Sequence, residues 1–252
     1  MDTESLINDF AIRCFRDTAD ADYLLARAAF RYQLAPQALW ASLQTIEKYL
    51  KCILLLHRIH GKGIRHSLSK ALDILSSSKK IVLNLTPASE QFIRHIDQFG
   101  ECRYLEISVI TYGGQIVDLD RIVWELRKFC TSQGYGYTEN KKKDSALKRV
   151  KLQDVTLREG FIPQKYRLPD GFLEKVINDK KHPAREMLLW QNGFFGKKGR
   201  RSVRHRGGFR AVNSPLFNHP EILDEVGRYV HIPPKVAEAY RKLMLELVAA
   251  AK

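Results

Sequence analysis

The sequence predicts an all-α fold, with a helical N-terminal half followed by a smaller, basic and mostly helical C-terminal part. Five stretches in the first 132 residues repeat apolar side chains at three- and four-residue steps, which is the spacing of one face of an α-helix. The apolar–polar alternation that is typical of strands is almost absent. The chain has 252 residues, of which 44% are hydrophobic, and this suits one or two domains with a sizeable core.

The first two helices have clear boundaries. We expect a helix over residues 3–32, with a break near Asp17. A second helix starts at Pro36, because proline suits the first turn of a helix, and it ends at Gly61 and Gly63. The core-facing side chains of this second helix are Leu39, Leu43, Ile46, Leu50 and Ile53.

Three further helices complete the first half. One carries Leu68 and Leu72, and another starts at Thr86 and stops at Gly100. The last covers residues 117–130, where the apolar face consists of Leu119, Ile122, Val123, Leu126 and Phe129. Residues 104–117 fit either a hairpin around Gly113-Gly114 or a helix end followed by a loop.

The composition then changes. Residues 133–145 are rich in glycine, lysine and polar side chains, so we expect a linker between a bundle at 1–132 and a C-terminal region at 146–252. In that region we expect four helices, at 171–178, 183–191, 220–229 and 234–250. Proline stands at or near the start of the last three.

The charge is concentrated in the second half. The whole chain has 42 Lys and Arg against 28 Asp and Glu, a net charge of +14. Residues 1–130 hold 17 basic and 15 acidic side chains, a net of +2, which leaves +12 for residues 131–252. A nearly neutral N-terminal half and a strongly basic C-terminal half indicate a polyanionic partner for the second half.

The densest cationic segment covers residues 196–210, and we call it the basic run. It contains no acid and is interrupted by glycines, which let main-chain N–H groups approach phosphates while arginine forks bind their oxygens. Trp190, Phe194, Phe195 and Phe209 flank or end the basic run, and an exposed ring among them could stack on bases. The predicted nucleic-acid-binding residues are Lys197, Lys198, Arg200, Arg201, Arg204, His205, Arg206 and Arg210. The structural alternative is a solvated loop whose aromatic residues anchor it to the core.

Other classes of protein find little support. The N-terminal sequence resembles neither a secretory signal nor a transit peptide, and no apolar stretch is long enough to span a bilayer, so we expect a cytoplasmic protein without a membrane partner. The four cysteines form no C-x-x-C pair, and the histidines are scattered, so we predict no metal site. Phosphate-loop and dinucleotide fingerprints are missing, and we predict no cofactor.

The first half resembles the HEPN family (higher eukaryotes and prokaryotes nucleotide-binding domain) over about residues 17–130. The resemblance rests on the alanine-rich run DADYLLARAAF, on E-K-x-x-K at residues 47–51, and on H-x-L-x-x-x-L from His66. It implies an up-and-down helical bundle, a homodimer, and either binding of RNA or nucleotides or metal-independent RNA cleavage. It also argues against strands at 104–117.

Cleaving members of this family resemble one another in an R-x(4–6)-H motif. Here seven residues separate Arg58 from His66, one more than the motif allows. Arg58 and His66 are the candidate catalytic residues, since an RNase without metal needs a base and a cation. The structural interpretation, in which His66 caps a helix and Arg58 is solvated, fits the failed spacing better.

Two functional classes follow. The first is an RNA- or nucleotide-binding protein, in which any catalysis would be that of a metal-independent endoribonuclease of toxin or defence type. The second is a non-catalytic interaction module whose basic C-terminal region docks on a protein or ribonucleoprotein partner. The expected partners are nucleic acid, with RNA preferred over DNA, and a second copy of the chain, while an antitoxin or another operon-encoded protein is a further candidate.

Overall fold

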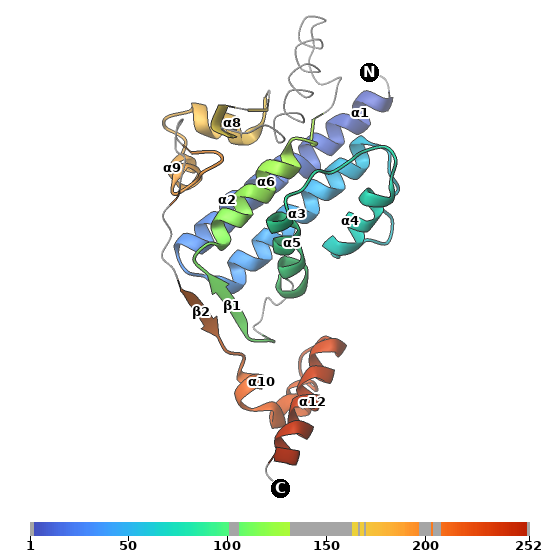
Figure 1. The fold of residues 1–252 in the computed structure, drawn as a ribbon, viewed down its shortest axis with the longest axis vertical. Coiled ribbons are helices and arrows are strands. Elements are labelled where there is room, and N and C mark those ends of the chain that lie inside the picture. Colours follow the sequence, from blue (N-terminus) through green and yellow to red (C-terminus); the bar gives the residue numbers. More distant parts are fainter. Residues whose placement is uncertain are drawn as a thin grey trace, which may run out of the picture.

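The computed structural model describes residues 3–100, 106–131, 163–165, 167–168, 170–196, 203 and 208–250. Within these ranges the chain is mostly helical, with one two-stranded sheet (Figure 1). This confirms the predicted predominance of helix. The predicted linker at 133–145 lies outside the described residues.

The N-terminal helix is continuous through the place where a break was expected. Helix α1 (Thr3–Phe10) passes into a π-helix (Ala11–Arg16) and then into α2 (Asp17–Arg31). The interruption near Asp17 is therefore a change of helical pitch rather than a gap between two helices.

The second helix, α3 (Ala35–Leu56), supplies the centre of the core, and it lies beside α2 (Figure 1). All five predicted core positions are at most 1% exposed, which confirms the apolar stripe. The prediction that Gly61 and Gly63 end this helix is wrong. Arg58 ends it in the left-handed conformation with φ 52°, while Ile59 N–H bonds back to the Leu54 carbonyl at 2.8 Å, as in a Schellman cap.

Helices α4 (Leu68–Ser77) and α5 (Pro87–Phe99) pack against each other and against α3. Thr86 caps α5 as predicted, because its side chain accepts from the Ser89 N–H. The first turn of α4 is capped from a neighbouring helix, since both carboxylate oxygens of Asp97 accept from its N–H groups at 2.6 and 3.2 Å.

Residues 104–117 contain a strand, but not a hairpin. Strand β1 (Val109–Tyr112) pairs antiparallel with β2 (Phe209–Val212), almost 100 residues further along the chain, with Thr111 opposite Arg210. Helix α6 (Gln115–Arg127) starts directly after β1. The expectation drawn from the resemblance, that no strand occurs here, is therefore wrong, and part of the predicted basic run is itself a strand.

Part of the second half packs on the first-half helices. After a 3₁₀ turn (Pro163–Lys165), helices α8 (Phe172–Asn178) and α9 (Arg185–Leu189) confirm two of the four predicted helices in shorter form. Their buried side chains belong to the same hydrophobic cluster as those of α2, α3 and α6. The contributing residues are Leu173, Val176 and Leu188, and Phe195 after α9 joins them.

The C-terminal helices form a separate small cluster, which lies below the sheet in Figure 1. It contains α10 (Pro215–Asn218), a 3₁₀ turn (Pro220–Ile222), α11 (Leu223–Val226) and α12 (Pro234–Ala250). The helix predicted at 220–229 is thus two short turns, whereas the one at 234–250 is confirmed. The Tyr240 hydroxyl donates to the Glu106 carbonyl at 2.8 Å, which attaches this cluster to the residues just before β1.

Two buried ion-pair clusters join α8 and α9 to the first-half helices. In the first, the guanidinium of Arg127 on α6 donates to Asp20 on α2 and to Glu174 on α8, with four donor–acceptor distances of 2.8–3.0 Å. The Tyr49 hydroxyl donates to Asp20 at 2.5 Å. Gly171 lies so close to this cluster that a side chain there would collide with Glu174.

The second cluster is centred on Arg27, which is completely buried. Its guanidinium pairs with Asp120 and donates to the backbone carbonyls of Met187 and Trp190, on and just after α9. The Tyr23 hydroxyl donates to Asp120 at 2.5 Å and accepts from Asn192 at 2.8 Å. Burying a charge without a partner is costly, so these contacts fix where α8 and α9 lie on α2 and α6.

Lys128 is a buried cation of a different kind. It is 2% exposed, and its ammonium lies 4.4 Å from the centroid of the Trp124 ring. Burial lowers the pKa of Lys128 to about 8, with Glu125 opposing this shift. The unfolded chain therefore binds more protons than the folded chain between pH 8 and the ordinary lysine value of 10.5.

We expect Lys128→Met to raise the free energy of unfolding at neutral pH. The pKa shift corresponds to about 3 kcal/mol, from which the lost cation–π contact removes about 1 kcal/mol, leaving a net gain of about 2 kcal/mol. The free energy of unfolding of the wild type should rise with pH through this window, so its difference from that of the variant should narrow toward about pH 10. Urea unfolding of both proteins as a function of pH measures this difference. Lys175→Met, at an exposed position of α8, is the control. A difference in free energy of unfolding that does not change with pH would contradict a lowered pKa of Lys128.

Among the described residues, no helix is both long enough and apolar enough to cross a lipid bilayer.

Candidate nucleic-acid interface

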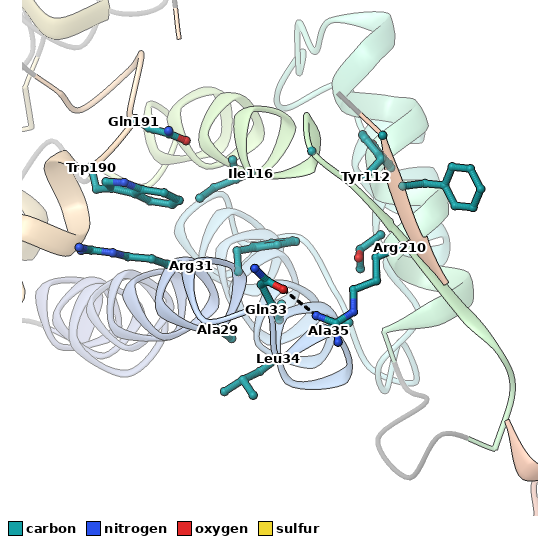
Figure 2. A pocket seen from close by; sticks show the side chains of 16 residues that line it. Ala29, Arg31, Gln33, Leu34, Ala35, Tyr112, Ile116, Trp190, Gln191 and Arg210 are labelled. Atoms are coloured by element: carbon teal, nitrogen blue, oxygen red, sulfur yellow. Dashed lines mark hydrogen bonds between the residues drawn. The ribbon is translucent and has the colours of Figure 1, made fainter. Parts of the chain in front are cut away.

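A pocket of about 470 Å³ opens where the turn between α2 and α3 meets the sheet and the end of α9 (Figure 2). In this view Trp190 and Arg31 lie on one side of it and Tyr112 and Arg210 on the other. Its volume is within the range of small-molecule sites. The pocket joins segments from both halves of the chain.

The pocket is cationic. Of the described residues that line it, two are arginines and none is acidic. Arg210 donates to the Gln33 side-chain oxygen at 2.8 Å, a neutral partner that leaves its charge uncompensated. Arg31 pairs at 2.9 Å with Glu186, whose side chain is 79% exposed, and such solvated pairs are weak. Both guanidinium groups are therefore placed to bind an anion.

Aromatic rings accompany these cations. The Arg31 guanidinium carbon lies 5.4 Å from the centroid of the Trp190 ring, a cation–π arrangement that holds both side chains in place. Phe209, which precedes Arg210 on β2, also lines the pocket and is 76% exposed. The Tyr112 hydroxyl donates to Asp118 at 3.0 Å, and burial raises the pKa of Tyr112, so it remains a neutral ring.

Two glutamines with unusual backbone conformations line the pocket. Gln33 (φ 61°) follows α2 and Gln191 (φ 44°) follows α9, and both have the left-handed conformation common just after a helix. Among the described residues, neither Nε2 of Gln33 nor the side-chain amide of Gln191 has a hydrogen-bond partner. These amides provide free donors and acceptors beside the rings and the cations.

The structure places only part of the predicted binding segment. Lys197, Lys198, Arg200, Arg201, Arg204, His205 and Arg206 lie outside the described residues, and their role stays a prediction. Arg210 is described, and it lines the pocket. The residue before the basic run and its last part are also placed, because Phe195 is buried against Tyr23 and Arg127 while Gly208 lies at the pocket.

The flanking aromatic residues divide into two groups. Phe195 is 2% exposed and Phe194 packs on Trp124 at a ring distance of 6.2 Å, so these two anchor the chain to the core. Trp190 and Phe209 line the pocket and are available for stacking. The structural interpretation therefore applies to Phe194 and Phe195, and the functional interpretation to Trp190 and Phe209.

The candidate catalytic residues Arg58 and His66 have separate sets of partners. Arg58 donates to Glu4 and Asn8 on α1 at 2.5 and 3.0 Å, and it caps α3. His66 Nδ1 lies 2.9 Å from a carboxylate oxygen of Glu47, which is almost buried on α3. His66 is not the cap of α4, because Ser67 has that position.

These residues also lie away from the pocket. Ala35, the first residue of α3, lines the pocket, whereas Glu47 is 12 residues further along the same helix. At 1.5 Å per residue this amounts to about 18 Å, and Arg58 lies beyond the far end of the helix. Any chemistry at His66 would therefore take place away from the two arginines of the pocket.

Sequence reasoning found Arg210, Trp190 and Phe209 but not Arg31, Gln33 or Tyr112. Arg31 and Gln33 look like ordinary polar residues at a helix end, and Tyr112 lies in residues 104–117, whose pattern fits more than one structure. No signal in the sequence brings them together: the pairing of β1 with β2 places Tyr112 near Arg210, Gln33 bonds to Arg210, and Arg31 shares the same pocket. Comparison with family models, with curated proteins and with solved structures gave no significant match to this chain.

Proposed function

We propose that this chain binds RNA through the basic run together with the pocket at Arg31 and Arg210. The observation that carries the proposal is that Arg210, the last residue of the basic run, lies in a pocket with a second arginine and aromatic rings, and that none of its described lining residues is acidic. Cations that bind phosphates and rings that stack on bases are the two components of single-strand binding sites. The preference for RNA over DNA rests on the resemblance to HEPN proteins.

The first test is direct binding in EDTA. We expect fluorescently labelled single-stranded RNA to bind without metal, more tightly than DNA of the same sequence, with an affinity that falls steeply as salt rises. Fluorescence anisotropy over a range of salt concentrations measures this. An absence of binding at low salt would refute the proposal, and equal affinities for RNA and DNA would refute its preference for RNA.

Metal-independent RNA cleavage is a second candidate, and one contact favours it. The nearly buried Glu47 carboxylate holds the ring of His66, whose side chain is 56% exposed, as an orienting group holds a general base. This candidate requires cleavage of total RNA in EDTA that is lost in His66→Ala and retained in His205→Ala. Cleavage that is unchanged in His66→Ala would exclude His66.

The binding partners are also proposed from the sequence. The HEPN-like arrangement of the helices and the homodimer rest on the resemblance, and so does an antitoxin or operon-encoded partner. A basic C-terminal region that docks on a ribonucleoprotein would use the same cations as RNA binding.

A further inference from the structure

We propose that the pocket between Trp190 and Arg210 holds a single nucleotide of the bound RNA, unstacked from its neighbours. This inference rests on the proposed RNA binding and adds which part of the ligand enters the pocket. The pocket combines two cations for a phosphate with rings for a base, and none of its described lining residues is acidic. A rod-like duplex offers no single base to such a pocket, whereas a single strand does.

The position of the phosphate follows from the arginines. Arg210 is exposed, and its only described hydrogen bond goes to the neutral side chain of Gln33. It belongs to β2, and the preceding Gly208 has φ 110°, a conformation that glycine adopts without strain. The basic run therefore enters the pocket through a residue that lets the main chain approach closely, and Arg210 is the first cation after it.

The position of the base follows from the rings and the amides. Trp190 is half-buried with Arg31 over its ring, so it is fixed in orientation before any ligand arrives. Phe209 also lines the pocket, and it is exposed on the face of β2 opposite to Arg210. The Nε2 of Gln33 and the side-chain amide of Gln191 lie beside the pocket and can hydrogen-bond to a base edge, as glutamine does with bases elsewhere.

Other features of the molecule give less support to a functional inference. The exposed side chain of Ile110 on β1 shows no sign of what would cover it. The buried cysteines Cys52 and Cys130 are shielded from solvent, and burial raises the pKa of the Cys130 thiol, which makes it unreactive. The pocket is the described site where charge, aromatic rings and free hydrogen-bonding groups coincide.

The test combines three variants of the full chain with two ligands. Arg210→Gln removes the phosphate contact, while Trp190→Leu and Phe209→Leu each remove a ring. Arg210 and Phe209 are exposed, so their variants should fold normally even if Trp190→Leu does not. The matched controls are Arg13→Gln in the π-helix and Phe217→Leu on α10, both exposed and away from the pocket.

We expect each pocket variant to weaken binding of single-stranded RNA by about tenfold to a hundredfold, since stacking or a charged contact contributes about that much. The controls should bind like the wild type. Adenosine 5′-monophosphate should compete with RNA for the pocket, whereas ribose 5-phosphate and inorganic phosphate should compete at least tenfold less well. Anisotropy of labelled RNA measures both.

The possible failures are distinguishable. If the wild type binds RNA and the folded pocket variants bind it equally well, the pocket inference falls while RNA binding stands. If adenosine monophosphate binds but the variants weaken only its binding and not that of RNA, the pocket is a site for a free nucleotide, and the inference falls as well. If neither ligand binds the wild type, RNA binding itself is refuted. A protein partner that binds only the wild-type pocket, without competition from RNA, would also overturn the inference.

Discussion

We expect Arg127→Met to lower the free energy of unfolding by roughly 3–5 kcal/mol, because it leaves two buried carboxylates without their counter-charge. Arg127 is 2% exposed and bonds to Asp20 and Glu174, whose side chains are 0% and 8% exposed. Burial alone would raise the pKa of Glu174, but the charge of Arg127 and its hydrogen bonds hold it below the usual value. Without Arg127 both carboxylates would face each other in the core. Urea unfolding of the two proteins measures the difference.

The loss in free energy of unfolding caused by Arg127→Met should depend on pH. In the folded variant the pKa values of Asp20 and Glu174 rise above their unfolded values, so the folded state binds more protons and its stability falls as pH rises. We therefore expect a larger deficit at about pH 8 than at about pH 5. The triple variant with Asp20→Asn and Glu174→Gln should regain part of the loss, because no unpaired charge remains.

The matched control is Arg121→Met on the same helix. Arg121 pairs with Asp118 at 2.7 Å, and both side chains are more than 20% exposed, so its loss should cost less than about 1 kcal/mol. If Arg127→Met lowered the free energy of unfolding as little as Arg121→Met does, the two carboxylates would have to reach water. The ion pairs would then not be what holds α8 on the bundle.

The second large effect is expected in RNA binding. Replacing Arg200, Arg201, Arg204 and Arg206 by alanine should flatten the salt dependence, because each phosphate contact on a single strand contributes roughly 0.7 to the log–log slope. Four lost contacts correspond to a slope change of about 3 and to a roughly hundredfold to thousandfold loss of affinity near 0.1 M salt. The loss should be similar for unrelated sequences, because phosphates carry no sequence information.

The control carries the same change in charge at exposed positions of the first half. It consists of Arg13→Ala, Lys62→Ala, Lys79→Ala and Arg94→Ala. We expect its salt slope to stay near that of the wild type. An unchanged slope in the basic-run variant would exclude the run as the contact surface, and a variant that unfolds would show that these arginines stabilise the fold instead.

Local patterns were sufficient for most helices. The stripe on α3 and the cap at Thr86 depend on residues three and four apart, so the sequence predicted them correctly. Helix ends were harder to predict. Arg58 and Gln33 adopt a left-handed conformation that is usually predicted only at glycine. Main-chain hydrogen bonds at these helix ends compensate for the strain.

By itself, the sequence determined which segments are helical, which faces are apolar and where the positive charge is concentrated, since all three follow from neighbouring residues. Only the tertiary structure decided that β1 pairs with β2, that Arg127 bonds to Asp20 and Glu174, and that Arg31 and Arg210 share a pocket. The partners in these contacts are separated by 47 to 179 positions in the sequence. In the sequence a buried arginine looks the same as a solvated one, and the entropy of closing long loops varies too slowly with their length to select a partner. The packing of the whole chain makes that selection.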